Sequence, residues 1–491
     1  MGAEDEPTVC CTRFRYVILI LGLLCLVVLQ ANVLLINLAF ICMSDDPSGL
    51  YDAGNGTTRN RFDYDPKEKG LIISIVAVGT ILGAFLFNWL HQKFGARLPF
   101  FAAGMISAVI TVATPTLAES SYYAFIAGRF LLGVSFSADF AAAGVICVAW
   151  APLAETATFL GVLLSFGPIA FSFTNPVVGA FCTSSLGWRG SFYTFGVITC
   201  FLFTIWIIIY RDSPRNHKMV TKSELAQIEQ DKTTEHVNRD GFVPYWEVCT
   251  NPTIIVVWVN SLIEVNTVII LLTYAPTYFN KVLGFSVAET SFYSSLGSII
   301  HSPLKILVAV ISDYVTCIPE KWRLCFFNTI ATALAGLACL SIGFVPSREM
   351  GVAALTLCCT LMAANSGGFF KCGALVSRQY GHFVMSQMQM TKCFAHLIGP
   401  TMVSLLTSSD HDHDGWRNVY MVNCVLLFIV LLPLISIKSG IRSAFTGQLP
   451  LLPIRNGRTG RIHEDNERDS TTGQRRTTEQ ENSQERVTRD D

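Results

Sequence analysis

Twelve long apolar segments constrain the fold of this 491-residue chain more than any other feature. A segment of about 20 mostly apolar residues is long enough to cross the hydrocarbon core of a membrane as a helix. A helix also satisfies its own backbone hydrogen bonds there. We expect the spans near residues 16–41, 70–90, 98–117, 122–147, 156–181, 190–210, 252–279, 287–311, 324–345, 350–376, 384–407 and 418–437. The sequence therefore predicts an all-α membrane protein with twelve transmembrane helices in two six-helix bundles.

The composition excludes a soluble enzyme fold for most of the chain. Charged residues make up 14% of it, against about 25% in an average globular protein. Hydrophobic residues make up 51%, and 34 residues are Phe. The net charge of −1 gives no reason to expect a nucleic-acid partner. The 16 Cys residues include no C-x-x-C pair, so we expect neither a zinc site nor a disulfide framework.

Polar segments divide the chain into five parts. The first apolar segment is too long for the core of a signal peptide, so we expect it to be retained. Thr221 and Glu224 form a capping-box pattern, which predicts a short surface helix near residues 222–231. The expected parts are a cytoplasmic N-terminus at 1–15, a six-helix bundle at 16–210, a central cytoplasmic loop at 211–251, a second six-helix bundle at 252–438 and a disordered cytoplasmic tail at 439–491.

The distribution of basic residues predicts the orientation of the chain. With twelve spans, 23 of the 35 Lys and Arg residues fall in loops on the side of the two termini, 8 fall in loops on the other side and 4 fall within helices. Basic loops stay in the cytoplasm, so we expect both termini there. The chain has one N-x-S/T sequon, at Asn55, and it lies on the opposite side. We expect glycosylation of Asn55, although one sequon can also arise by chance.

The two halves of the sequence resemble each other. Gly167-Pro168 in the fifth span has a counterpart in Gly399-Pro400 of the eleventh, and the basic loop 91–97 has one at 313–323. Paired breaks in two halves are typical of transporters built from repeats. Incidental packing kinks are the alternative for the Gly-Pro pairs.

Polar and ionisable residues at membrane depth are the candidate site residues, because they are costly there. In a transporter of six plus six helices, the first and fourth helices of each half line the central cavity. On those helices we single out Gln30, Asn32, Arg129, Asp139, Glu264, Asn266 and Lys371. We expect Lys305 and Lys392, on other helices, to extend toward the membrane surface. For His301 and His396 we expect hydrogen bonds to neighbouring groups rather than proton transfer.

Arg129 and Glu264 carry the main functional hypotheses. Arg129 lies about 10 Å into the fourth span. There a guanidinium could hold a carboxylate or phosphate with two hydrogen bonds, or it could form a structural salt bridge. Glu264 is near the middle of the membrane, where it could exchange a proton or stay paired with a base. Asp139 and Lys371 could form a gate between the fourth and tenth spans, unless Lys371 extends to the surface.

The remaining motifs give no catalytic site. Residues 410–414, Asp-His-Asp-His-Asp, could attract a metal ion, but five consecutive residues do not easily converge on one centre. We therefore expect a solvated acidic loop. The sequence contains no P-loop, nucleophile elbow or H-E-x-x-H motif, so we expect neither an enzyme nor a cofactor.

Several short stretches resemble the anion:cation symporter branch of the major facilitator superfamily, over about residues 13–440. They are Trp150-Ala151-Pro152-Leu153 with Glu155, Gly187-Trp188-Arg189, Ser213-Pro214, Pro276-Thr277-Tyr278-Phe279, Ser312-Asp313, and Trp416 with Val419-Tyr420. The stretch Gly367-Gly368-Phe369-Phe370-Lys371 is more similar to a nematode-like subgroup.

The resemblance implies a major facilitator fold and transport by alternating access. Arg129 matches an arginine that the family uses for organic anions. Gln30 and Glu264 stand where relatives carry further arginines, and Phe136 stands where they carry an acid. The resemblance therefore does not extend to glutamate or sialic acid as the substrate.

We expect a secondary active transporter of a small organic solute, most simply an organic anion or phosphate, coupled to H⁺ or Na⁺. The alternative is a solute receptor or sensor of transporter-like fold without net transport. The expected partners are the solute, the coupling ion and the lipid bilayer of the plasma membrane or an intracellular vesicle.

Overall fold

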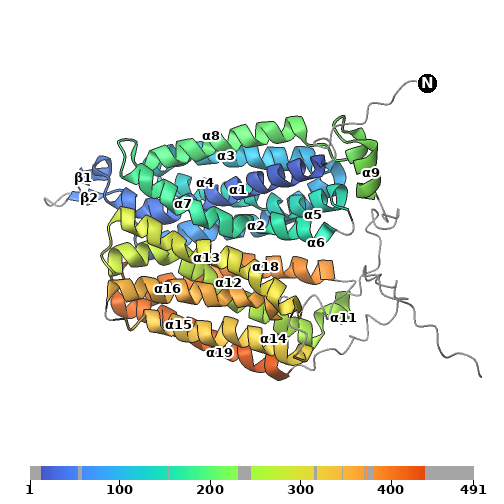
Figure 1. Ribbon diagram of the computed structural model, residues 1–491. Coiled ribbons are helices and arrows are strands. Elements are labelled where there is room, and N and C mark those ends of the chain that lie inside the picture. Colours follow the sequence, from blue (N-terminus) through green and yellow to red (C-terminus); the bar gives the residue numbers. More distant parts are fainter. Residues whose placement is uncertain are drawn as a thin grey trace, which may run out of the picture. The chain divides into compact units, whose positions relative to one another are not determined.

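The computed structural model describes residues 13–52, 58–152, 155–229, 245–314, 318–345, 347–369, 372 and 381–436. Within these ranges the chain is a bundle of long helices with one short β-hairpin (Figure 1). The expected sites at Asn55 and Lys371 lie outside the described residues, as do most of the N-terminal segment, part of the central loop and the tail.

The first six spans precede the short surface helix α9. They are formed by α1 (Phe14–Ser44), α2 (Pro66–Phe94), α3 (Arg97–Ser120), α4 (Tyr122–Phe136) with α5 (Ala138–Trp150), α6 (Thr156–Leu164) with α7 (Phe166–Cys182), and α8 (Gly187–Ile209). Between α1 and α2 lie η2 (Pro47–Gly49) and the antiparallel strands β1 (Leu50–Asp52) and β2 (Thr58–Asn60).

The segment between the halves contains η4 (Pro214–Asn216), α9 (Lys222–Glu229), which lies where the surface helix was predicted, and α11 (Tyr245–Cys249). The last six spans are α12 (Pro252–Thr277) with η5 (Tyr278–Val282), α13 (Val287–Tyr314), α14 (Glu320–Thr329) with η6 (Ile330–Leu334) and α15 (Ala335–Ile342), α16 (Arg348–Met362) with η7 (Ala363–Gly367), α18 (Gly381–Leu406), and α19 (His413–Ser436).

Eleven helices among the described residues are long and apolar enough to cross a membrane. The remaining predicted span, the eleventh, is α18, which has the length but is interrupted by polar residues such as Gln387, Lys392 and His396. This polarity has a structural reason, because α18 packs between α2 and α12 in the interior of the bundle. The structure thus agrees with twelve helices, and the predicted span at 350–376 runs past η7 into residues that are not described.

Local sequence signals explain where several helices begin. Asp65 and Glu68 form a capping box at the start of α2, with Pro66 in the first turn. Asn251 accepts hydrogen bonds from the backbone N–H groups of Thr253 and Ile254 at the start of α12. These caps satisfy backbone donors that a helix leaves unpaired at its beginning.

The two Gly-Pro pairs are not equivalent in the structure. Gly167-Pro168 lies in the first turn of α7, directly after a break between α6 and α7 at Ser165. Proline is tolerated there because the first-turn N–H has no partner within the helix. Pro400 instead lies inside α18, which continues without interruption. The predicted correspondence therefore holds in position along the chain but not in local structure.

The two ends of the bundle differ. We call them the hairpin end, where α1 ends and β1–β2 lie, and the α9 end, where α1 begins and α9 lies (Figure 1). At the hairpin end a disulfide joins Cys42 and Cys182, whose Cα atoms are 5.9 Å apart. We expected no disulfide framework. The structure corrects this by one bond, between residues 140 positions apart in sequence.

Close helix packing joins the two halves toward the hairpin end. A Cβ at Gly179 of α7 would lie 2.3 Å from the Cβ of Ser291 in α13, so only glycine fits this approach. Asn175 donates a hydrogen bond to Ser294 over 3.1 Å in the same interface. Helices α2 and α18 form a second interface between the halves, which contains Gly70 and Ser404.

Candidate functional site

A pocket lies between the two halves and receives side chains from α1, α2, α4, α12 and α18. Its lining consists of Gln30, Val33, Leu34, Asn37, Ile73, Val76, Ala77, Thr80, Arg129, Phe136, Thr273, Lys392, Cys393 and His396. The cavity measures about 30 Å³, which is room for about two water molecules. A solute therefore requires the halves to move apart.

Arg129 is the buried cation of this pocket, with 2% of the residue exposed. Its Nη2 donates to the carbonyl of Val33 over 3.1 Å and its Nε to that of Ile72 over 3.4 Å. Nη1 is buried and has no hydrogen-bond partner. Gly133, one turn further along the chain, lets α4 approach the backbone of Val76 in α2. Backbone carbonyls thus hold Nε and Nη2 of the guanidinium, and Nη1 with its two N–H groups is left for a ligand.

Lys392 is a second cation at the pocket, and our expectation that it extends to the membrane surface was wrong. Its ammonium lies 5.1 Å from the ring centroid of Phe166 in the first half, within cation–π range. It also interacts electrostatically with Asp139 of α5. One sequence signal could have indicated this position: Lys392 and His396 are four residues apart and share one helix face.

Asp139 is fully buried. We expected a gate pair with Lys371, which lies outside the described residues. Among the described residues, Asp139 interacts electrostatically with Lys392, which belongs to the eleventh span rather than the tenth. The pair still joins the two halves, because Asp139 and Lys392 come from opposite sides of the chain's centre.

Glu264 belongs to a neighbouring buried group in the second half. Its Oε1 accepts a short hydrogen bond from Asn365 Nδ2, and its Oε2 is buried without a hydrogen-bond partner. Lys305 interacts electrostatically with Glu264, and its expected extension toward the surface stays a prediction. Lys305 also interacts with Lys392. Glu264 is not among the residues that line the Arg129 pocket.

The predicted neutral polar residues of α1 differ in whether they line the pocket. Gln30 lines the pocket and its Oε1 is buried without a hydrogen-bond partner. Asn32 instead donates to Ser107 and Thr199 over 2.9 and 3.0 Å. The reason is helical period: two residues turn the face by about 200°, whereas seven residues return to it. Asn37, seven residues after Gln30, accordingly lines the pocket.

Asn266 also lies away from the pocket. Its Nδ2 donates to Asn423 of α19 over 3.3 Å, within the second half. The histidines contact backbone carbonyl groups, as expected. His301 Nδ1 lies 2.8 Å from the oxygen of Cys359, and His396 Nδ1 lies 2.9 Å from that of Lys392.

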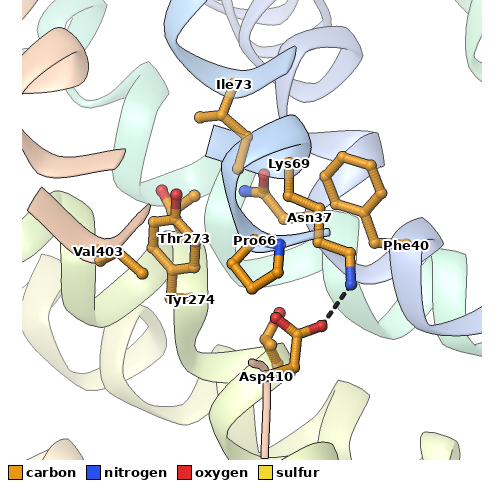
Figure 2. A pocket seen from close by; sticks show the side chains of 10 residues that line it. Asn37, Phe40, Pro66, Lys69, Ile73, Thr273, Tyr274, Val403 and Asp410 are labelled. Carbon is orange, nitrogen blue, oxygen red and sulfur yellow. Dashed lines mark hydrogen bonds and ion pairs between the residues drawn. The ribbon is translucent and has the colours of Figure 1, made fainter. Parts of the chain in front are cut away.

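A second pocket continues from the first toward the hairpin end (Figure 2). Asn37, Ile73 and Thr273 line both pockets, so the two pockets are adjacent. Figure 2 shows Lys69 of α2 pointing to Asp410, with which it forms an ion pair across the halves. The Asp410 side chain is only 15% exposed. The expectation of a solvated loop was thus wrong at this residue.

The rest of the 410–414 segment is held by local hydrogen bonds. Asp412 accepts from the backbone N–H groups of Ser408 and Gly415. These bonds lower the pKa of Asp412 to about 2. His411 contacts the carbonyl of Lys281. Among the described residues no group of three His, Cys, Asp or Glu could hold a metal ion.

A bundle of twelve helices with a cation-containing pocket between its halves is the architecture of a membrane transporter. The model of the Major Facilitator Superfamily matches residues 20–400, and the chain belongs to this superfamily. Solved structures of similar fold include a bacterial homolog to the human lysosomal transporter Spinster, inward-facing and occupied, with a TM-score of 0.66 at 14% identity over 86% of this chain and 96% of that one. The xylose transporter XylE from E. coli, partially occluded and inward open, has a TM-score of 0.62 at 14% identity over 85% and 96%.

The similar curated proteins agree with the resemblance seen in the motifs of the chain. Sodium-dependent phosphate transport protein 3 of Mus musculus is 24% identical over 78% of this chain and 80% of its own length. Sialin of Homo sapiens is 24% identical over 86% and 88%. A probable small intestine urate exporter of Mus musculus is 23% identical over 79% and 80%.

Proposed function

We propose that this protein is a secondary active transporter of a small organic anion, which binds at Arg129 and crosses the membrane by alternating access. One observation carries the proposal: Arg129 Nη1 is buried and unpaired on a guanidinium that lines the pocket between the halves. An unpaired donor on a buried cation is costly unless a ligand satisfies it. The relatives named for phosphate, sialic acid and urate transport support an anionic solute.

The arrangement of contacts supports alternating access. The Lys69–Asp410 pair closes the path at the hairpin end, and the Asp139–Lys392 pair joins the halves deeper in the bundle. Charged pairs between two bundles are contacts that can break on one side while others form. An anion that reaches both halves would be released when they separate.

We propose that the hairpin end faces the cell exterior or an organelle lumen. Three features support this orientation: the predominance of basic residues in loops of the other side, the sequon at Asn55, and the Cys42–Cys182 disulfide. Disulfides persist in oxidising compartments and are rare in the cytosol. A glycosidase-sensitive mass that disappears in Asn55→Gln would support this orientation. Glycosylation that persists in Asn55→Gln would argue against Asn55 as the modified residue.

We propose proton coupling, with Glu264 as the group that gains and loses the proton. The carboxyl is buried, with one oxygen hydrogen-bonded to Asn365 and the other without a hydrogen-bond partner. The site can therefore accommodate either the charged or the protonated carboxyl. The nearby Lys305 favours the charged form, whereas burial favours the neutral one. A sodium ion is the alternative coupling ion.

Uptake into vesicles that contain the purified full-length protein tests the function. Labelled organic anions and inorganic phosphate are presented under an imposed pH gradient, and separately under a sodium gradient. We expect saturable accumulation of an organic anion under the pH gradient. Saturable binding without flux would instead favour a receptor, and accumulation under the sodium gradient alone would overturn proton coupling.

A further inference from the structure

Within the proposed function, and resting on it, the structure also restricts the class of anion. We infer that the substrate is a monocarboxylate with an apolar body, held between Arg129 of the first half and Lys392 of the second. Three observations carry this inference: the balance of buried charge, the apolar part of the pocket lining, and the position of the two cations on opposite halves.

The charge balance favours a singly charged anion. At membrane depth, in the interior that the structure describes, three cations, Arg129, Lys305 and Lys392, stand with two acids, Asp139 and Glu264. While Glu264 is ionised, Lys392 interacts with Asp139 and Lys305 with Glu264, so the excess positive charge remains at Arg129. A buried charge is costly unless it is balanced. One carboxylate balances it, whereas a dianion would add an uncompensated negative charge.

The pocket lining favours an apolar body. Half of its fourteen residues are apolar: Val33, Leu34, Ile73, Val76, Ala77, Phe136 and Cys393. Among the neutral polar side chains, the Thr80 hydroxyl is already engaged, because it donates to the carbonyls of Val76 and Gly133. A solute with many hydroxyl groups would leave several of them unpaired on entering this pocket, each at a cost.

Phe136 is the most informative apolar residue. It lies seven residues after Arg129, two helical turns further along, and therefore on nearly the same face of α4. Arg129 and Phe136 both line the pocket. A cation followed at this spacing by an aromatic ring matches a ligand with a charged group and an apolar part. Inorganic phosphate would leave the ring without a partner.

Lys392 completes the carboxylate site from the other half. Arg129 contributes its unpaired Nη1, and an ammonium has three donors, so Lys392 has donors for both Asp139 and a carboxylate oxygen. A carboxylate has two oxygens, one for each cation. The ligand would thereby bridge the halves.

Binding to the purified full-length protein in lipid nanodiscs tests this inference. The probes are 3-phenylpropionate, its neutral amide, acetate, succinate, N-acetylneuraminate and inorganic phosphate, measured by calorimetry. We expect 3-phenylpropionate to bind most tightly and the amide at least about tenfold more weakly, since a hydrogen bond to a charged group contributes about 1.5–3 kcal/mol. Tighter binding of phosphate, succinate or N-acetylneuraminate would overturn the inference, as would the absence of binding by any carboxylate.

Variants test the two contacts separately. Lys392→Gln should weaken 3-phenylpropionate at least about tenfold, and Lys392→Arg, which keeps the charge, should restore most of the loss. Phe136→Ser should weaken 3-phenylpropionate more than acetate. Lys93→Gln, at an exposed position over Trp89, is the matched control and should change nothing. Wild-type affinity in both Lys392→Gln and Phe136→Ser would overturn the inference.

The failure of this inference can be distinguished from failure of the proposed function. If another anion binds tightly, is transported, and depends on Arg129, only the substrate class is wrong. If anion binding persists unchanged in Arg129→Gln, the proposed function is wrong, because it places anion binding at Arg129.

Discussion

The cation of the first half and the charges of the second half are held in different ways. Arg129 is fixed by two backbone carbonyl groups and retains an unpaired donor. Lys305 and Lys392 instead interact electrostatically with the carboxylates of Glu264 and Asp139. Backbone carbonyls cannot change protonation state, whereas carboxylates can. The comparison suggests a division of roles, in which the first half supplies a constant anion anchor and the second supplies groups that respond to protons.

The largest effect is expected from a change at Arg129, the constant anion anchor of the first half. Arg129→Lys keeps the charge but cannot donate in three directions from a planar group. We expect uptake to fall by about 10- to 100-fold, as lost hydrogen bonds to a charged group imply. Arg97→Lys is a matched control, because Arg97 also donates to a backbone carbonyl, that of Ile207, outside the pocket. Uptake at the wild-type rate in Arg129→Lys would show that the guanidinium is not the anchor.

The second prediction concerns Glu264, a group of the second half that we propose responds to protons. Glu264→Gln imitates the protonated side chain, so solute exchange should persist while accumulation driven by a pH gradient disappears. One proton and a gradient of one pH unit support about tenfold accumulation in the wild type. Counterflow and net uptake in the same vesicles separate the two activities.

Glu289→Gln is the control for this variant, since Glu289 is exposed and caps the start of α13 through Ser286. If Glu264→Gln still concentrates solute with a pH gradient alone, Glu264 has a structural role only.

A third, smaller effect is expected at the hairpin end, where one ion pair closes the path. Asp410→Asn should raise the modification rate of a cysteine placed at Asn37 by about fivefold, because a pair of this kind contributes about 1 kcal/mol. A membrane-impermeant thiol reagent and mass spectrometry of the modified peptide measure the rate. Asp414→Asn, which alters an exposed pair with Arg417, should leave it unchanged. Equal modification rates in Asp410→Asn and Asp414→Asn would mean that the Lys69–Asp410 ion pair does not close the path.

The smallest effect on transport is expected at Asp46, which belongs to the stable part of the first half. It accepts hydrogen bonds from Ser48, Trp188 and Arg189. Burial alone would raise the pKa of Asp46, but these bonds outweigh it and lower the pKa to about 2. Asp46→Asn should reduce stability by about 1–3 kcal/mol and change uptake little.

The pH dependence follows from the direction of this shift. Because the folded pKa of Asp46 is lowered, its contribution to stability is complete above about pH 4 and is lost as the pH falls toward 2. Thermal unfolding of wild type and Asp46→Asn across this range measures it. A difference between the two proteins that stays constant down to pH 2 would contradict the assignment to the ionised carboxylate.

The sequence alone determined the features that depend on each helix separately. The twelve spans, the surface helix at Lys222–Glu229 and the depth of Arg129 follow from local hydropathy, capping and rise per residue. The motifs were sufficient to indicate the family. Membrane insertion depends on the side chains of one segment at a time, so no knowledge of its neighbours is needed.

Only the tertiary structure decided which groups meet. Glu264 is paired with Asn365, which is 101 residues away, and Cys42 with Cys182, which is 140 residues away. Lys392 faces the interior because α18 packs between α2 and α12. Asn32 does not line the pocket, because its face of α1 is turned toward Ser107 and Thr199. These outcomes depend on the rotation and neighbours of each helix, which packing between distant segments sets and which hydropathy along one segment does not contain.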